Sequence, residues 1–516
     1  MYKLGIDVGG TNTDAVIIDE NLAVVAAVKH PTTEDVHDGI LCAIRDVLSA
    51  AGIDRGEITQ TMLGTTQCTN AIVERRHLAK IGLVRIGAPA TTGIPPMVDW
   101  PSDIQSVVRD YVIIRGGYEY DGREIAELDE DAARKFFESM RGKVQSVAIS
   151  CAFSTVRNDH EKRIAELCRE VMGEDVHISV SSEIGSMGLI ERENATILNA
   201  ALYQVAEQIT EGFARSLADE GIVNADIYLS QNDGTLMTME HARRYPILTI
   251  ACGPTNSIRG ASYLSNIKNA IVIDVGGTTT DFGVIQNGFP RESSVAVTIG
   301  GVRTNFRMPD IISIGLGGGS IVREKPDGTV TVGPDSVGYR ITSEALVFGG
   351  KVVTATDVAV KLGMADIGDA SLVSGLDEGL ARKAMDAIRA MAEDGIDAMK
   401  ISSQDIEAVL VGGGSVLLPK NLHGTSTVYN PEHSGCANAI GSAISKVSGT
   451  YEQLVDYNVT PRETAIEQAK AEAARLAVEA GAIEDTVEII ESEDVPLAYY
   501  PGNTSRVKVK AAGDLR

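Results

Sequence analysis

The chain has 516 residues, which is long enough for at least two domains because about 150 residues is usual for one. Its formal net charge of −25 disfavours nucleic acids and anionic membrane surfaces as partners. No uninterrupted apolar stretch approaches the ~20 residues that span a membrane, and the first residues lack the pattern of a secretory signal, so we expect a cytoplasmic protein without a membrane partner.

The six cysteines are dispersed along the chain, with no Cys-x-x-Cys pair and no histidine clustered beside one. This spacing indicates reduced thiols and argues against structural zinc or an iron–sulfur cluster. Cys68 and Cys252 stand in segments rich in glycine and threonine, where they either line a cleft or, more commonly, fill the interior as small apolar side chains.

The first predicted element is a hairpin around residues 7–14, Asp-Val-Gly-Gly-Thr-Asn-Thr-Asp. Apolar runs with strand character, 4–6 and 15–18, stand on either side of it. Paired glycines let the backbone come close to a ligand, and consecutive amides with threonine hydroxyls form a concavity of hydrogen-bond donors that suits phosphate oxygens. The predicted phosphate-binding residues are Gly9, Gly10, Thr11, Asn12 and Thr13.

A mixed sheet with helices packed on it is predicted next, because further strands are followed by a helix over about 34–50 and another strand. Thr65, Thr66 and Asn70 stand where this last strand gives way to a helix, a place where hydroxyls and free helix amides converge. Either a threonine only caps the helix, or these side chains contact a substrate. The residues themselves favour neither role.

A long helix is predicted over about 189–218, and its apolar stripe recurs at helical spacing, which indicates a side that faces the core. The stripe consists of Leu198, Leu202, Val205, Ile209 and Phe213. Arg192, Thr196, Asn199 and Tyr203 share another face of the same helix. That face either points into a cleft or is solvated, which is the usual fate of a polar stripe.

The octapeptide returns at residues 274–281 as Asp-Val-Gly-Gly-Thr-Thr-Thr-Asp, with only the sixth position changed. One copy is most often a tight structural hairpin, but a structural hairpin needs no acidic residue at both ends, and chance recurrence of this length is negligible. The repeat therefore predicts two equivalent halves around a polyphosphate. The leading aspartates, Asp7 and Asp274, would face each other and hold a hard divalent cation, while Asp14 and Asp281 would mainly support the turns. The predicted second loop is Gly276, Gly277, Thr278 and Thr279.

Two later glycine turns are candidates for the same site. Gly-Leu-Gly-Gly-Gly-Ser at 315–320 follows the second hairpin, so Gly317 and Gly318 are nucleotide-side candidates, although a glycine run alone often marks only a bend. Val-Leu-Val-Gly-Gly-Gly-Ser at 409–415 is a stronger signal, because an apolar strand enters the turn. Its turn residues are Gly412, Gly413, Gly414 and Ser415.

The C-terminal part begins with a predicted helix over 436–447. Thr-Pro-Arg-Glu at 460–463 predicts a capping box with proline at the first helical position, and Gly481 is expected to end that helix. Alternating apolar residues around 501–503 predict a small β unit for the tail.

Two phosphate loops, one in each half, followed by a late glycine turn resemble the actin-like ATPase superfamily, in which the nucleotide lies between two domains. The resemblance implies an α/β fold of two actin-like (ribonuclease H-like) ATPase domains with a nucleotide cleft between them. It makes 7–14 the first phosphate motif, 274–281 the second and 409–415 the adenosine motif, with 436–447 as the second connecting helix. The expected domains are 1–265, 266–450 and a C-terminal helix with a β tail at 451–516.

Other segments narrow the resemblance to the hydantoinase A/oxoprolinase family, although that family usually has an aromatic residue where Asn12 stands. These segments are 64–71 with 74–76, 182–185 with 191–196, 252–255 and 314–320. The resemblance implies that ATP, with Mg²⁺, phosphorylates the amide oxygen of a hydantoin, 5-oxoproline or another lactam. It also implies an oligomer with a large hydantoinase B-type partner subunit. It adds Arg192 and Asn194 to Thr65, Thr66 and Asn70 as expected substrate contacts.

Two other functions stay open on the sequence. One is an ATP-dependent ketone carboxylase subunit of the acetone or acetophenone type, which would use the same site. The other is a nucleotide-switched regulator without catalytic activity. The dispersed cysteines argue against those regulators that activate radical dehydratases, because such activators need a cysteine-ligated cluster.

Overall fold

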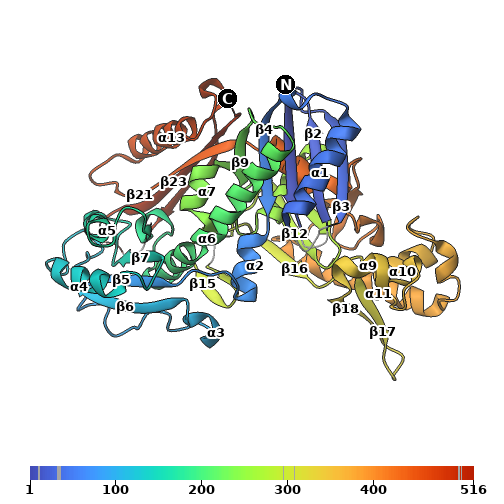
Figure 1. The fold of residues 1–516 in the computed structure, drawn as a ribbon, viewed down its shortest axis with the longest axis horizontal. Helices are drawn as coiled ribbons and strands as arrows, with labels where there is room; N and C mark the ends of the chain where they lie inside the picture. Colours follow the sequence, from blue (N-terminus) through green and yellow to red (C-terminus); the bar gives the residue numbers. More distant parts are fainter. Residues whose placement is uncertain are drawn as a thin grey trace.

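The computed structural model describes residues 1–9, 12–31, 36–293, 296–306, 308–497, 500 and 502–515. Within these residues the chain builds two large β-sheets with helices packed on them, and a smaller inserted sheet (Figure 1). Each large sheet carries one copy of the repeated octapeptide, the first at β1–β2 and the second at β11–β12. The predicted α/β fold class is confirmed.

The first sheet has nine strands in the order β22-β23-β21-β10-β9-β4-β1-β2-β3. β1 runs antiparallel to β2 but parallel to β4, and β4 runs parallel to β9. The carboxyl ends of β1, β4 and β9 therefore lie at one edge, which is where open α/β sheets bind ligands. The strands span Tyr2–Val8 (β1), Asn12–Ile18 (β2), Val24–Pro31 (β3), Ile58–Thr65 (β4), Asp226–Ser230 (β9), Leu236–Thr238 (β10), Val447–Asp456 (β21), Glu488–Pro496 (β22) and Thr504–Gly513 (β23).

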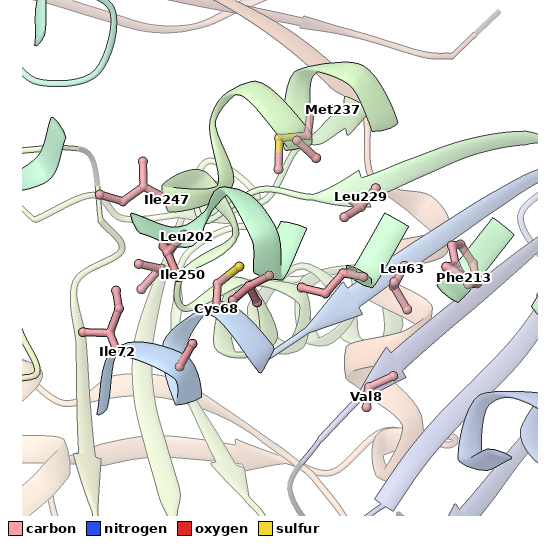
Figure 2. Close-up of a cluster of buried hydrophobic side chains, with 14 of the residues drawn as sticks. Val8, Leu63, Cys68, Ile72, Leu202, Phe213, Leu229, Met237, Ile247 and Ile250 are labelled. Carbon is pink, nitrogen blue, oxygen red and sulfur yellow. The ribbon is translucent and has the colours of Figure 1, made fainter. Parts of the chain in front are cut away.

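Helices α1 (Val36–Ala51) and α6 (Leu189–Asp219) pack against each other beside this sheet. Figure 2 shows part of their core, in which Leu63 of β4 lies among side chains that include Leu202 and Phe213 of α6. All five residues of the predicted apolar stripe of α6 are buried, so that prediction is confirmed. The six cysteines are free thiols, and Cys68 and Cys252 are each 1% exposed, which confirms the interior role.

A separate four-stranded parallel sheet is inserted between β4 and β9, in the order β6-β5-β7-β8. The sequence-based predictions do not include β5 and β6 of this unit. A bidentate ion pair between Arg85 and Glu193, both fully buried, ties β5 to α6 with N–O distances of 2.5 and 2.7 Å. The elements span Ile81–Ala88 (β5), Ser102–Gln105 (α3), Val108–Arg115 (β6), Glu130–Met140 (α4), Ser146–Cys151 (β7), Asp159–Met172 (α5) and His177–Val180 (β8).

The second large sheet has the order β13-β12-β11-β19-β20, with β16 also paired to β12. Its strands are Ala270–Val275 (β11), Thr280–Gln286 (β12), Phe289–Pro290 (β13), Ile311–Ile314 (β16), Ile406–Val411 (β19) and Thr425–Tyr429 (β20). The ribbon of Ser320–Glu324 with Val330–Ser336 (β17, β18) packs into the core of this sheet, whereas the ribbon of Val297–Ile299 with Val302–Thr304 (β14, β15) packs on α6 and joins the core of the first half. The helices here are Ile341–Glu344 (α9), Ala355–Lys361 (α10) and Glu378–Met399 (α11).

Helices α8 (Cys252–Ser265) and α12 (Ala437–Ile444) form the layer between the two large sheets. α12 contacts β1 and β2 of the first sheet, whereas α8 contacts β12 and β19 of the second. The two helices approach so closely that a Cβ added to Gly260 would lie 1.8 Å from the carbonyl oxygen of Ala437. Glycine is therefore required at this crossing, and the spacing of the two sheets is fixed by backbone contact.

The C-terminal elements differ from the prediction in two ways. Helix α13 (Arg462–Glu479) begins after Pro461, so Thr460 lies one residue too early to cap it and no side-chain cap bond forms. Strand β23 pairs with β21 and β22 pairs with β23, so the tail extends the first sheet rather than forming the separate small β unit expected for it. Gly481, with φ +109°, follows the helix end as predicted.

Candidate active site

The two hairpins have the same register and the same turn. Asp7 lies opposite Asp14 across β1 and β2, and Asp274 lies opposite Asp281 across β11 and β12. The amide of Gly9 donates to the carbonyl of Asn12 at 3.0 Å, and the equivalent bond from Gly276 to Thr279 is 2.9 Å. The predicted strand–turn–strand structure is confirmed for both copies. Gly10 and Thr11 lie outside the described residues.

Each hairpin is flanked by a third strand that places one more polar side chain in the row. Lys29 of β3 lies opposite Asp14, and its Nζ donates to Asp14 Oδ1 at 2.5 Å. Ser313 of β16 lies opposite Asp281 and donates its hydroxyl to that carboxylate. The sequence interpretation did not single out Lys29. The signal that identifies it is cross-strand pairing, which depends on the register of β3.

Consecutive residues of α8 serve the two leading aspartates. Asn256 Nδ2 donates to Asp7 Oδ1 at 3.4 Å, and Ser257 Oγ donates to Asp274 Oδ2 at 2.5 Å. Asn438 of α12 gives Asp7 a second bond, from Nδ2 to Oδ2 at 2.9 Å. The interlayer helices therefore bring the ends of β1 and β11 to a common place, although the aspartates belong to different sheets.

Burial dominates the titration of these carboxyl groups. It raises the pKa of Asp7 to about 7, with a further increase from Asp14 and Asp274 and an opposing effect of the Asn256 and Asn438 amides. Burial also raises the pKa of Asp274, against the hydrogen bond from Ser257 and the charge of Lys29.

Burial likewise raises the pKa of Asp281 to about 7, against the bond from Ser313. Burial alone would lower the pKa of Lys29, but the Asp14 carboxylate outweighs it and leaves that pKa above its ordinary value. Lys29 therefore stays charged, and the site combines one ammonium with carboxyl groups that resist ionisation in the absence of a cation.

The second phosphate loop rests on both predicted glycine turns. Gly318 and Gly319 donate their amides to the carbonyls of Gly276 and Gly277, at 3.0 and 2.8 Å. A Cβ on Gly317 would lie 2.5 Å from the amide nitrogen of Thr278. On the other side Gly414 donates to the Val275 carbonyl at 2.7 Å, and a Cβ on Gly412 would lie 2.3 Å from Asp274 Oδ1. The structure thus brings three sequence-predicted segments together around one loop.

The residues fit a polar ligand at the first loop. The hydroxyl of Thr13 and Oδ1 of Asn256 are both buried, and neither has a hydrogen-bond partner within the described chain. Buried polar atoms are usually paired, so each of these atoms leaves a hydrogen bond for a ligand or water, Asn256 Oδ1 beside Asp7 and the Thr13 hydroxyl on the opposite face of the sheet with Val8. No three His, Cys, Asp or Glu side chains of the described residues are grouped to hold a metal. Mg²⁺ beside a nucleotide needs only one or two carboxylates, with water and phosphate as its other ligands.

The predicted substrate residues at the end of β4 lie beside the first hairpin. Thr66 is the residue before α2 (Gln67–Glu74), makes no side-chain cap, and donates its hydroxyl to the Val8 carbonyl at 3.5 Å. Thr65 is buried, and its hydroxyl accepts the Gln67 amide at 3.2 Å. Asn70 is exposed one turn along α2 and donates to the Thr66 hydroxyl at 3.5 Å. Thr66 and Asn70 are therefore linked by hydrogen bonds to the end of β1, whereas the Thr65 hydroxyl bonds only within the start of α2.

Arg192 and Asn194 lie in the interior rather than on an open face. Arg192 is 1% exposed, and its guanidinium donates to the Ser181 hydroxyl and to backbone carbonyls, including that of Cys151 at 2.7 Å. Asn194 accepts from Trp100 Nε1 at 2.8 Å and donates to the Arg303 carbonyl at 2.9 Å. Both side chains thus anchor the start of α6, and the geometry favours a positioning role over contact with substrate.

A cavity of about 1450 Å³ lies at a different place, between the 182–188 segment, the 286–293 segment and the polar face of β21, β23 and β22. Its lining includes neither phosphate loop, so this cavity is distinct from the hairpin site. No helix among the described residues has the length and apolar character needed to cross a membrane.

Comparison with known proteins gives family matches along most of the chain. Residues 3–172 match the hydantoinase/oxoprolinase N-terminal region, and residues 192–408 match hydantoinase/oxoprolinase. The caprolactamase subunit alpha of Pseudomonas jessenii is 28% identical over 421 residues, which cover 75% of this chain and 58% of that protein. The acetophenone carboxylase gamma subunit of Aromatoleum aromaticum is 26% identical over 394 residues, covering 70% of this chain and 53% of its own length.

The crystal structure of the ATP-dependent caprolactamase from Pseudomonas jessenii has a TM-score of 0.79 at 20% identity, and the alignment covers 100% of this chain and 88% of that one. The likeness supports the α/β fold. The chain spans little more than half the length of the two curated relatives, so their whole activities do not transfer with the match. The two matched regions together cover most of the sequence, and the chain belongs to the hydantoinase/oxoprolinase family.

Proposed function

We propose that this chain is the ATP-using subunit of an amidohydrolase that opens cyclic amides, and that its site transfers the terminal phosphate of ATP to the amide oxygen. The observation that carries the proposal is the pair of aspartates, Asp7 and Asp274, held by adjacent residues of α8. A repeated loop at each aspartate gives the site two places to hold a polyphosphate.

The chemistry explains why ATP is needed. An amide is a poor electrophile because its nitrogen donates electrons into the carbonyl. Phosphorylating the oxygen gives an imidate phosphate with a good leaving group, which water can then attack to open the ring. The protein's task is to align the terminal phosphate with the amide oxygen and to offset the charge that develops, which is mainly positioning and electrostatics.

In this proposal each predicted segment has a distinct role. The amides of Gly9 and Gly276 close the two turns, the hydroxyl of Thr13 would offer a donor to phosphate oxygens, and Asp7 and Asp274 would hold Mg²⁺, which supplies charge neutralisation. The remaining nucleotide contacts come from residues that share the loops or the glycine turns. They are Gly10, Thr11, Asn12, Gly277, Thr278, Thr279, Gly317, Gly318, Gly412, Gly413, Gly414 and Ser415. The substrate would lie near Thr65, Thr66 and Asn70, at the carboxyl edge of the first sheet.

A second subunit is part of the proposal. The two relatives described above are both named as subunits, and one of them belongs to a caprolactamase. We expect a large hydantoinase B-type partner to complete ring opening within an oligomer. The resemblance to the acetophenone carboxylase subunit supports one alternative, in which the same site activates a ketone enolate or bicarbonate for carboxylation.

One experiment separates these functions. ATP turnover by the chain, alone and with a co-purified partner, would be measured with a hydantoin, 5-oxoproline, caprolactam, or a ketone with bicarbonate. Stimulation by a cyclic amide without bicarbonate supports the amidohydrolase. A strict need for bicarbonate and ketone supports the carboxylase. Absence of nucleotide binding by the pure chain would contradict both.

A further inference from the structure

The two hairpins extend into cross-strand rows that differ in their third member. Asp7, Asp14 and Lys29 follow one another across β1, β2 and β3. The corresponding row in the second sheet is Asp274, Asp281 and Ser313. Directly opposed residues lie on the same face of a sheet, so each row presents its side chains together. The duplicated halves therefore share both aspartates but place a lysine in one row and a serine in the other.

Lys29 reaches from the first half of the molecule to the second. Its Nζ is bonded to Asp14, and its Cε lies 3.7 Å from the position that a Cβ on Gly413 would take. Its charge also acts on Asp274. The side chain of Lys29 is 33% exposed, whereas that of Asp14 is 3% exposed. An ammonium has three N–H donors, so the bond to Asp14 leaves donors for other acceptors.

Neutralising Asp14 does not by itself require a lysine. The equivalent carboxyl, Asp281, is accommodated by a hydrogen bond from the hydroxyl of Ser313. A polyphosphate at this site, however, meets the carboxyl groups of both rows, which repel it. A fixed positive charge between the first hairpin and the glycine turn at Gly413 offsets that repulsion where the phosphates are proposed to lie.

We propose that Lys29 binds the terminal phosphate of ATP, with Asp14 holding its ammonium in position; this deepens the proposed function and rests on it. Lys29 is then a direct ligand contact, and it distinguishes ATP from ADP because its charge acts most strongly on the phosphate that ADP lacks. The serine in the second row supplies no such charge.

The test is calorimetric titration of ATP and ADP, with Mg²⁺, into the purified full chain and three variants. Lys29→Met should weaken ATP binding by about 10- to 100-fold, the scale for a hydrogen bond to a charged group, and should weaken ADP binding much less. The double variant Asp14→Asn/Lys29→Met also removes the Asp14 carboxylate, which the single variant leaves unpaired. It should bind ATP as weakly as Lys29→Met does. Lys383→Met, in a surface ion pair with Glu324, is the matched control and should bind both nucleotides like the native chain.

Two results would overturn the proposal. If Lys29 only neutralises Asp14, the double variant regains native ATP affinity. If Lys29→Met loses ATP and ADP affinity equally, the lysine does not discriminate the terminal phosphate. Should Lys29→Met fail to fold, the double variant carries the test, because it contains no unpaired buried charge. A native chain that binds ATP while the lysine variants are unaffected refutes only the Lys29 contact, whereas a native chain that binds no ATP refutes the proposed function as well.

Discussion

In the second hairpin the hydroxyl of Thr280 donates to the Leu316 carbonyl at 2.7 Å, whereas the corresponding hydroxyl of Thr13 in the first hairpin is buried without a partner in the described chain. The difference extends to the loops. The second loop is held from both sides by backbone bonds to the turns at Gly318 and Gly414. Side chains of α8 bond to the leading aspartate of both hairpins, and Asp7 of the first hairpin receives a further bond from Asn438 of α12.

This contrast separates two ways of building a hairpin turn from the same octapeptide. In the second copy the Thr280 hydroxyl and the carbonyls of Val275, Gly276 and Gly277 are bonded within the protein, so these parts of the hairpin are fixed before any ligand arrives. The first copy keeps an unsatisfied hydroxyl and a charged lysine, so part of its hydrogen bonding is left for a ligand to complete. The two hairpins share their strand register but differ in which hydrogen bonds are already made within the protein. The same substitution should therefore have different effects in the two hairpins.

Asp274→Asn should have the largest effect and should lower ATP turnover by about 10²-fold or more, the scale for losing one key electrostatic group. The reason is that the amide keeps the shape of the side chain and its contact with Ser257 but not the charge that holds Mg²⁺. Turnover would be measured at saturating Mg²⁺ with the partner present. Asp7→Asn should behave alike, since both aspartates are proposed to share the metal.

The control for these variants is Asp335→Asn, which removes a carboxylate from a surface ion pair with Arg323. It should leave turnover unchanged. If Asp274→Asn hydrolysed ATP at the native rate, Asp274 would not be a metal ligand, and the two aspartates would have different roles.

Gly317→Ala should have the second largest effect, because the added methyl group would clash with the backbone of the second hairpin turn. The added Cβ would lie 2.5 Å from the amide nitrogen of Thr278, so the backbone of the second loop must shift. A displacement of about 1 Å at a site that positions phosphates can cost up to about 10²-fold in rate, and we expect a loss of about tenfold or more in ATP affinity. Equilibrium titration with ATP measures it.

Gly375→Ala is the matched glycine control, because a Cβ there meets nothing within 4 Å. Unchanged ATP affinity in Gly317→Ala would show that the 315–320 turn supports the fold and not the nucleotide loop.

The pH dependence of stability should be shared by both hairpins. Because the pKa of Asp7 and that of Asp281 rise from 3.8 to about 7 on folding, the folded state holds more protons than the unfolded state between these values. The free energy of unfolding of the ligand-free chain should therefore fall as the pH rises from about 4 to about 7, by a few kcal/mol at about 1.4 kcal/mol per pKa unit. Denaturant titrations at a series of pH values measure this slope.

Asp7→Asn and Asp281→Asn should each make that slope shallower, and Asp335→Asn should not. A slope that is the same in all four proteins would mean that other groups set the pH dependence, and that the two buried carboxyl groups titrate normally.

The sequence predicted the parts of the fold that repeat or alternate locally. Both hairpins, the α6 stripe and the glycine turns follow from patterns within a few residues of one another. The inserted sheet was missed in part because β5 and β6 contain no repeated motif and β6 carries charged residues among its apolar ones, and the tail was misplaced because pairing of β23 with β21 is a long-range contact. Sequence periodicity carries no information on which sheet a strand joins.

The candidate site likewise contains residues that the sequence predicts and residues that it does not. Asp7, Asp274 and the loop residues were found because they stand inside a motif. Lys29 was missed because it becomes part of the site only through the register of β3 against β2. Arg192 was proposed as a substrate contact from resemblance alone, and its burial against Ser181 and the Cys151 carbonyl depends on an inserted domain whose packing the sequence does not reveal.

The smallest predicted effect tests the contrast between the hairpins most directly, by making the same substitution in each copy. Thr280→Val removes the hydroxyl that donates to Leu316 and leaves that carbonyl without its partner, so the free energy of unfolding should fall by about 1 kcal/mol or slightly more. Thr13→Val removes a buried hydroxyl that has no partner in the described chain, so the ligand-free protein should lose nothing or become slightly more stable. With ATP the order should reverse, since Thr13→Val lacks the donor that the first loop offers to phosphate and should bind several-fold more weakly.

Denaturant midpoints and ATP titrations of the two variants decide the matter: equal losses of stability would show that the first hairpin is as fully bonded as the second, and unchanged ATP affinity in Thr13→Val would show that its hydroxyl does not serve a ligand.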